Sequence, residues 1–239
     1  MAKLGVNIDH VATLREARRI SYPDPAAAAA ICEEAGCDSI VCHLREDRRH
    51  IKDADVKRLC ETVTTRLNLE MSTAKDIVDI ACAVRPAQAT LVPEKRKELT
   101  TEGGLDVVKY EKRIAVVIER FGRNGIETSL FIGPSKRQID ASKKSGSEIV
   151  ELHTGAYANA KNRAAMSREL DNIRRAADYA LSLGMEVNAG HGLNYNNVKE
   201  VARIKGMNEL NIGHSIISRA VLVGLKQAVE EMLELSRAL

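Results

Sequence analysis

The sequence is poor in aromatic residues and has no long apolar run. Aromatic side chains make up 3% of the 239 residues, and tryptophan is absent. Proteins that bind single-stranded nucleic acid stack its bases on aromatic rings, so this scarcity argues against a nucleic-acid partner. No segment approaches the roughly 18 apolar residues of a membrane span, and no signal-peptide pattern is found at the N-terminus. The net charge of +3 is small. We therefore expect a cytoplasmic protein that binds neither nucleic acid nor membrane.

Cysteine is scarce as well. The five cysteines are odd in number and form no C-x-x-C pair. Three of them, Cys32, Cys60 and Cys82, fall in predicted helices. This pattern favours reduced thiols in a packed core over a disulfide framework.

Short strand-like runs alternate with helical stretches along the whole chain. Strands are predicted at residues 4–9, 38–43, 66–71, 88–92, 127–132, 148–153, 185–189 and 209–212, and helices at 23–35, 53–65, 73–84, 107–124, 134–145, 167–183, 195–204 and 215–238. Strict alternation predicts an α/β fold with a parallel sheet. Eight units without a break in composition predict a single (β/α)8 TIM barrel domain over residues 1–239. The alternative is a doubly wound open sheet, but its G-x-G-x-x-G fingerprint is missing after the first strand.

Polar residues repeatedly share one face of a predicted strand. Residues two apart point the same way, and the polar pairs are Asn7 with Asp9, Asn68 with Glu70, Glu151 with His153, and Glu209 with Asn211. Because the outer faces of barrel strands pack on helices, we expect these pairs to face the lumen. The last predicted helix has Val221, Leu225, Val229 and Met232 on one face, which we interpret as packing on the barrel rather than as an interface.

The histidines are placed unevenly. All six lie at or just past a predicted strand end, and the predicted helices contain none: His10, His43, His50, His153, His191 and His214. Two of them bracket the segment HLREDRRH at residues 43–50. A charged loop of this kind is often only a solvated turn. At the carboxyl end of a barrel strand, however, it favours anion binding and proton transfer.

The last two predicted strands end in glycine-containing loops suited to phosphate. Gly213 permits close backbone approach, and Ser215 is a candidate cap for the following helix, whose N-terminus favours an anion. His191, between Gly190 and Gly192, is a candidate proton donor, with a simple tight turn as the alternative. Glu70, among apolar neighbours at the end of the third strand, is a candidate base whose pKa burial would raise.

A catalytic metal and an enzyme Schiff base are both disfavoured. The first strand has no H-x-H pair, and no other metal-ligand spacing of His and Cys occurs. No lysine falls inside the eight predicted strands, so a lysine nucleophile is not expected. We therefore expect no metal and no cofactor.

Motifs in order along nearly the whole chain resemble the pyridoxine 5'-phosphate synthase family of vitamin B6 biosynthesis. The most specific are HLREDRRH at 43–50, LVPEKR at 91–96 and TTEGGLD at 100–106; the others are GVNIDH at 5–10, YPDP at 22–25, NLEM at 68–71, ELHTG at 151–155, VNAGHGL at 187–193 and LNIGH at 210–214. The resemblance implies a (β/α)8 barrel that condenses 1-deoxy-D-xylulose 5-phosphate with 3-amino-2-oxopropyl phosphate. The substrates would form their imine with each other. It also implies a homo-oligomer, an octamer.

The resemblance assigns roles to fourteen residues. His43 and Glu70 would accept protons, His191 would donate one, and Glu151 would stabilise developing positive charge. Contacts to the substrates would come from Asn7, Asp9, His10, Arg18, Arg45, His50 and Thr100, and the phosphate grip would be completed by Gly192, Gly213 and His214. Arg48, Arg49, Glu46 and Asp47 would only shape the charged loop.

The sequence departs from the family at two places. Arg19 stands where family members usually have a glycine, which leaves open whether Arg18 or Arg19 reaches the substrate. Gly133 and Pro134 replace a more usual acidic residue after the fifth strand.

Two rival functions remain at this point. One is a phosphosugar isomerase on the same barrel, with Glu70 as base and a histidine as electrophile. The other is a non-catalytic binder of phosphate ligands or nucleic acid, which the histidine placement disfavours.

Overall fold

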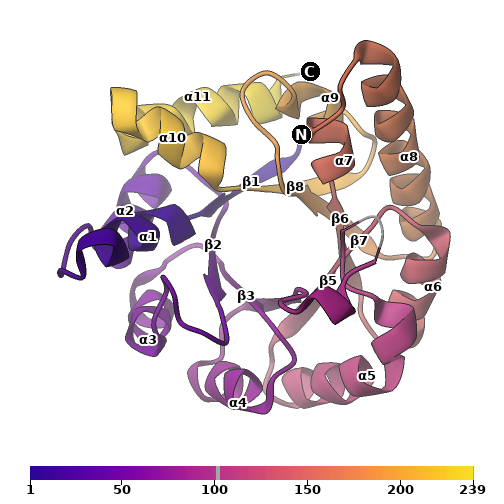
Figure 1. The fold of residues 1–239 in the computed structure, drawn as a ribbon, viewed down its shortest axis with the longest axis horizontal. Helices are drawn as coiled ribbons and strands as arrows, with labels where there is room; N and C mark the ends of the chain where they lie inside the picture. Colours follow the sequence, from indigo (N-terminus) through magenta and orange to yellow (C-terminus); the bar gives the residue numbers. More distant parts are fainter. Residues whose placement is uncertain (101–102, 239) are drawn as a thin grey trace.

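The chain folds into a closed barrel of eight parallel strands surrounded by helices (Figure 1). The computed structural model describes residues 1–100 and 103–238, so Thr101 and Glu102 of the TTEGGLD motif lie outside the described residues. The strands pair in chain order, and β8 pairs with β1 to close the ring. They are β1 (Lys3–Asn7), β2 (Ser39–Leu44), β3 (Leu67–Met71), β4 (Gln88–Leu91), β5 (Glu127–Ile132), β6 (Ile149–His153), β7 (Glu186–Gly190) and β8 (Met207–Ile212). The predicted (β/α)8 barrel is confirmed.

The helices cover the outer faces of the strands (Figure 1). They are α1 (Asp9–Arg18), α2 (Pro25–Glu34), α3 (Asp53–Thr62), α4 (Lys75–Val84), η1 (Arg96–Glu98, a 3-10 turn), α5 (Val107–Arg123), α6 (Lys136–Lys144), α7 (Gly155–Ala158), α8 (Arg163–Ser182), α9 (Val198–Ala202), α10 (His214–Val223) and α11 (Leu225–Arg237). Three elements were not predicted: α1, the 3-10 turn η1 and the short α7. Cys32, Cys60 and Cys82 lie in α2, α3 and α4 as predicted, and all five cysteines are free.

The predicted first strand was two residues too long. It ends at Asn7, whose Oδ1 accepts the Asp9 backbone N–H at 2.9 Å, and α1 begins at Asp9. Asp9 and His10 are therefore the first residues of a helix, and the prediction that helices contain no histidine is wrong for His10 and also for His214, the first residue of α10. The strand also includes Lys3, so the prediction of lysine-free strands was wrong there. Lys3 is exposed, at the strand's amino end.

The lumen of the barrel is polar, as the strand pattern predicts. Thr90 Oγ1 in β4 donates to Asn68 Oδ1 in β3 at 2.8 Å, and Asn211 Nδ2 in β8 donates to Glu151 Oε2 in β6 at 2.7 Å. The side chains of opposite parity, such as Leu4 and Val6 of β1, are fully buried in the apolar core. Hydrogen bonding inside the lumen offsets the cost of burying these polar groups.

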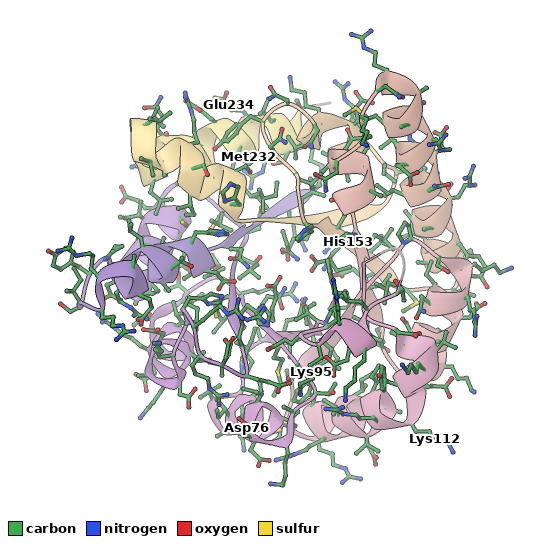
Figure 2. The ribbon with its side chains drawn as sticks, viewed as in Figure 1. Asp76, Lys95, Lys112, His153, Met232 and Glu234 are labelled. Carbon is green, nitrogen blue, oxygen red and sulfur yellow. The ribbon has the colours of Figure 1, made fainter. Side chains whose placement is uncertain are left out.

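The predicted last helix is two helices. Gly224 adopts φ +88°, a conformation that side chains rarely take, and separates α10 from α11. In α11, Met232 is fully buried while Glu234 lies on the exposed side (Figure 2). Val229 is buried too, but Val221 in α10 is 76% exposed, so the prediction that it packs on the barrel is wrong. The break at Gly224 changes the helix direction, so one periodic face no longer continues through both halves.

Among the helices of the described residues, none combines the length and apolarity needed to cross a membrane.

Candidate active site

A cavity of about 700 Å³ opens where the strands end. Ten of the fourteen predicted site residues line it: Asn7, Asp9, His10, His43, Glu70, Glu151, His191, Gly192, Gly213 and His214. They come from β1, β2, β3, β6 and from the segments that follow β1, β7 and β8. Residues far apart in the sequence meet there because parallel barrel strands all end on one face.

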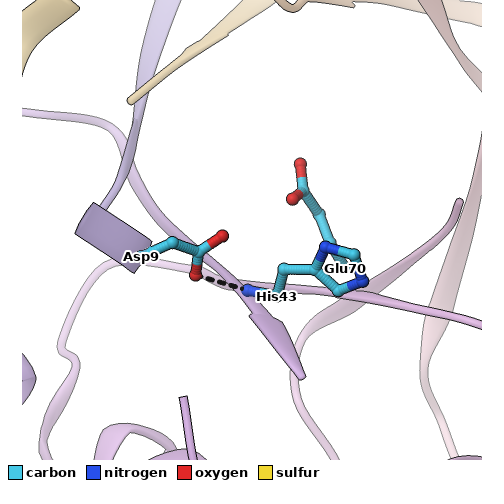
Figure 3. A group of neighbouring side chains, drawn as sticks. All are labelled: Asp9, His43 and Glu70. Atoms are coloured by element: carbon cyan, nitrogen blue, oxygen red, sulfur yellow. Dashed lines mark hydrogen bonds between the residues drawn. The ribbon is translucent and has the colours of Figure 1, made fainter. Parts of the chain in front are cut away.

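Asp9, His43 and Glu70 form a tight group on one side of the cavity (Figure 3). The Asp9 Oδ1 accepts the backbone N–H of His43 at 2.8 Å, and Glu70 Oε2 accepts a hydrogen bond from Asn7 Nδ2 at 3.2 Å. One side-chain atom of each residue lies within 4.8 Å of the others. Such a group can share protons, or it can hold a cation if its carboxyls are ionised.

Burial decides which form these carboxyls take. It raises the pKa of Asp9 to about 6, although the hydrogen bond from the His43 N–H works in the opposite direction. Burial, reinforced by the neighbouring Glu151 and Asp9 carboxyls, raises the pKa of Glu70 well above its ordinary value. Near neutral pH the shifts therefore favour the protonated form of Glu70 and leave Asp9 mostly ionised, so the group contains both a proton donor and a proton acceptor.

Glu151 is buried in the barrel and lies next to Asn211 of β8 and Gly190 of β7. Its side chain accepts the Asn211 amide, and a Cβ added at Gly190 would lie 2.3 Å from its Oε1. Glycine is required at this position because a larger residue would displace the carboxyl. Burial raises the pKa of Glu151 to about 7, partly opposed by the Asn211 hydrogen bond.

His191 follows β7 in a strained backbone conformation with φ +77°. The Thr154 hydroxyl is within 2.8 Å of the Gly190 carbonyl and 2.7 Å of the His191 carbonyl and holds this turn. The His191 ring stacks on His153, with centroids 4.9 Å apart, and the edge of Phe131 contacts His153. Burial lowers the pKa of His191, which favours the neutral imidazole.

His153 was not given a role from the sequence, yet it lines the cavity and lies at the barrel mouth (Figure 2). The signal for it was its position at the end of β6, two residues after Glu151 on the same strand face.

Two helix N-termini meet at the cavity. His10 in α1 and His214 in α10 have ring centroids 5.0 Å apart, and burial together with His214 lowers the pKa of His10. Gly213 is the N-cap of α10, and it lines the cavity together with His214. Ser215 was predicted to cap this helix, but its hydroxyl donates to the Leu193 carbonyl at 2.9 Å instead. The free N–H groups at the start of α10 suit an anion.

Four predicted contacts do not line the cavity: Arg18, Arg45, His50 and Thr100. Arg18 is exposed at the end of α1, and Arg19 after it adopts φ +52°, a left-handed conformation that glycine takes more readily than arginine. His50 packs edge-on against His43, and burial and neighbouring cations lower its pKa to about 4. The Thr100 hydroxyl is buried, with no hydrogen-bond partner among the described residues.

The charged residues between Arg45 and His50 largely pair with one another or with nearby helices. Arg49 donates to Asp47, whereas Arg48 donates to Asp53 and Asp76. Glu46 accepts the Ser72 hydroxyl and pairs with Lys95 at 2.8 Å. These pairs give the loop a defined shape.

Glu94 contacts the cavity residue His43, although it does not line the cavity itself, and it was not predicted from the sequence. It follows β4 in the LVPEKR motif, its side chain is only 5% exposed, and its Oε1 lies 3.1 Å from Nε2 of His43. Burial opposes its ionisation, but hydrogen bonds from His43 and the Glu46 N–H lower the pKa of Glu94 below its ordinary value. The only sequence signal was an acidic residue just past a strand end.

The raised pKa of Glu151 predicts a dependence of stability on pH. Its ordinary value is 4.5 and its folded value about 7, so between these values the unfolded chain has released a proton that the folded chain retains. The unfolding free energy therefore falls as pH rises from about 4.5 to about 7. In Glu151→Gln this fall should be absent. Between pH 4.5 and about 7 the unfolding free energy of the variant should therefore rise, relative to that of the wild type, by roughly 1–3 kcal/mol.

Urea unfolding of both proteins at several pH values measures this difference. All other ionisable groups are the same in both proteins, so their contributions to the difference cancel. A constant difference between the two proteins over the whole range would show that Glu151 ionises normally.

Comparison with known proteins identifies the family of the chain. The sequence pattern of the family described as "Pyridoxal phosphate biosynthesis protein PdxJ" matches residues 4–238. A pyridoxine 5'-phosphate synthase of Coxiella burnetii is 56% identical over 232 residues, covering 97% of each chain, and one of Synechococcus is 59% identical over 232 residues, also covering 97% of each. Phosphoribosyl anthranilate isomerase of Thermus thermophilus shares the fold, with a TM-score of 0.60 over 98% of this chain and 97% of that one at 13% identity. The chain belongs to the PdxJ family of pyridoxal phosphate biosynthesis proteins.

Proposed function

We propose that the chain condenses 1-deoxy-D-xylulose 5-phosphate with 3-amino-2-oxopropyl phosphate to give pyridoxine 5'-phosphate, inorganic phosphate and water. The observation that carries this proposal is the meeting, in one cavity, of three carboxyls with raised pKa values and the proposed proton-transfer histidines. Imine formation, phosphate elimination and ring closure all move protons. Groups poised between protonation states are suited to these steps.

The cavity supports an imine formed between the two substrates. No lysine is among its lining residues in the described part of the chain. The amine of one substrate and the ketone of the other then react together, and the enzyme moves protons around them. His43 and Glu70 accept protons, His191 donates one, and Glu151 stabilises positive charge as it develops.

Both substrates carry phosphate. The start of α10 and the loop at Gly192 bind one phosphate through backbone N–H groups, with His214 beside them. Asn7, Asp9 and His10 contact the substrates from the ends of β1 and α1. For Arg18, Arg45, His50 and Thr100 the support is the family resemblance, since they do not line the cavity.

The proposed assembly is a homo-oligomer. Val221 and Leu222 on α10 are 76% and 78% exposed, and Leu14 on the adjoining α1 is 59% exposed. Val221 and Leu222 are consecutive, and an exposed apolar pair of this kind supports a contact with another protein surface. Family resemblance supports an octamer.

The direct test incubates the protein with both substrates and follows pyridoxine 5'-phosphate by absorbance. Product should form only when both substrates are present. Omitting either substrate is the control, and no product from the complete mixture would contradict the proposal and leave a phosphosugar isomerase as the next candidate.

Glu70→Gln should leave substrate binding nearly intact and lower turnover by roughly 10²–10⁴, the usual contribution of an acid–base group. Glutamine keeps the shape of the side chain and can still accept the Asn7 amide, but it cannot exchange a proton. Steady-state kinetics separates kcat from KM. Turnover equal to that of the wild type would remove Glu70 from the mechanism.

Activity should survive exhaustive chelation. Asp9, His43 and Glu70 lie close enough to hold a cation, but metal ligands must be deprotonated and burial favours the protonated form of Glu70. Turnover before and after chelator treatment is the measurement. Activity that is lost and then restored by Zn²⁺ or Mn²⁺ would show that the site uses a metal.

A further inference from the structure

Glu94 and His43 meet although 51 positions separate them in the sequence. His43 is in β2, and Glu94 lies three residues past the end of β4. Their side chains are only 5% and 11% exposed, and 3.1 Å separates the Glu94 Oε1 from the His43 Nε2. A hydrogen bond shielded from water in this way fixes the ring more firmly than one on the surface.

We infer that Glu94 is a positioning residue that holds the proton of neutral His43 on Nε2 and so presents the lone pair of Nδ1 to the cavity. Neutral imidazole carries its proton on one nitrogen only, and a carboxylate can only accept a hydrogen bond. The Glu94 carboxylate therefore stabilises the Nε2–H tautomer. A base needs a lone pair to accept a proton, and Nδ1 would supply it. The inference therefore rests on the proposed role of His43 as a base.

The Glu94 carboxylate is itself held in place by groups of the loop that follows β2. The backbone N–H of Glu46 lies 3.0 Å from Oε2 and 3.3 Å from Oε1, and the Arg45 Nη2 is 3.8 Å from Oε2. The Glu94 backbone is also fixed, because Glu98 Oε2 accepts the N–H groups of Glu94 and Lys95 at 3.1 Å each. The carboxylate thus reaches His43 without ordering a mobile side chain.

The His43 ring is constrained on its other sides too. Asp9 holds its backbone N–H at 2.8 Å, and the His50 ring packs edge-on with centroids 6.3 Å apart. Figure 3 shows the ring beside the Glu70 side chain. With Nε2 engaged by Glu94, Nδ1 is the nitrogen left for proton transfer.

Glu94→Gln is the sharpest variant, because the surroundings determine how glutamine sits. The Glu46 N–H and Arg45 are donors directed at the Oε2 position, so the amide oxygen faces them and the amide N–H₂ faces His43 Nε2. That group donates and favours the Nδ1–H tautomer, which has no lone pair for the substrate. We expect kcat to fall by roughly 10²–10⁴ with little change in KM, the scale seen when a catalytic histidine is held in the wrong tautomer.

The tautomer can be read without any substrate. Imidazole ¹⁵N spectra of the free protein distinguish a protonated ring nitrogen from one with a lone pair, and loss of a signal in His43→Ala assigns it. We expect the proton on Nε2 in the wild type and on Nδ1 in Glu94→Gln. A role limited to tying the loop to β4 would lower stability and leave the tautomer unchanged.

Two further variants control for charge and for loop shape. Glu46→Gln removes a carboxylate from the same loop, where it pairs with Lys95 and Ser72 but does not contact His43, and it should keep the tautomer and kcat of the wild type. Glu94→Asp keeps an acceptor on a shorter side chain and should recover part of the kcat lost in Glu94→Gln. If Glu94→Gln keeps the Nε2–H tautomer, or changes it without lowering kcat, the inference is overturned.

Failure of the proposed function gives a different result. A wild type that forms no pyridoxine 5'-phosphate contradicts the proposed reaction, while the ¹⁵N spectra still report whether Glu94 sets the tautomer.

Discussion

Burial of carboxyl groups in a polar barrel lumen is the constraint on which the site depends. An ionised carboxylate away from water is costly, so Asp9, Glu70 and Glu151 shift towards their protonated forms. Amides soften this cost without removing it: Asn7 donates to Glu70, and Asn211 donates to Glu151. A lumen filled with aliphatic side chains would be more stable, but it could not hold groups that change protonation near neutral pH. The barrel gives up some stability to place them there.

The barrel itself could be predicted because its causes are local and repeated. Alternating elements and the polar parity of strands such as β3 and β8 identify the ring and its inner face. The errors arose where one local feature changes the chain direction. Asn7 accepts the Asp9 N–H and ends β1 early, and Gly224 turns the chain between α10 and α11. Periodicity shows no sign of either, because one is a side-chain bond and the other a backbone dihedral angle.

The site could be predicted as far as it follows from strand ends. The fourteen residues as a set came from the family resemblance and not from strand geometry. Ten of them meet in the cavity because parallel strands deliver their last side chains to one face. Arg18 and Thr100 are on a helix end and in a loop, where strand geometry gives no direction. Glu94 was missed for another reason. Its importance comes from a contact with a residue two strands away, and no spacing in the sequence encodes that contact.

Carboxyls and imidazoles are therefore prepared for chemistry by different physical means. A carboxyl needs only a change in solvation to become a donor or an acceptor, and burial in the lumen supplies it. A neutral imidazole has one ring nitrogen that donates and one that accepts, so what must be fixed is the nitrogen that carries the proton and the direction of the ring. The His43 ring is oriented by its hydrogen bond with Glu94. The His191 ring is oriented by stacking on His153 and by a strained turn whose carbonyl groups contact the Thr154 hydroxyl. Solvation can be set by the barrel as a whole, but ring orientation requires individual partners from the loops. This is why the residues that orient histidines are harder to find from sequence than the carboxyls they work beside.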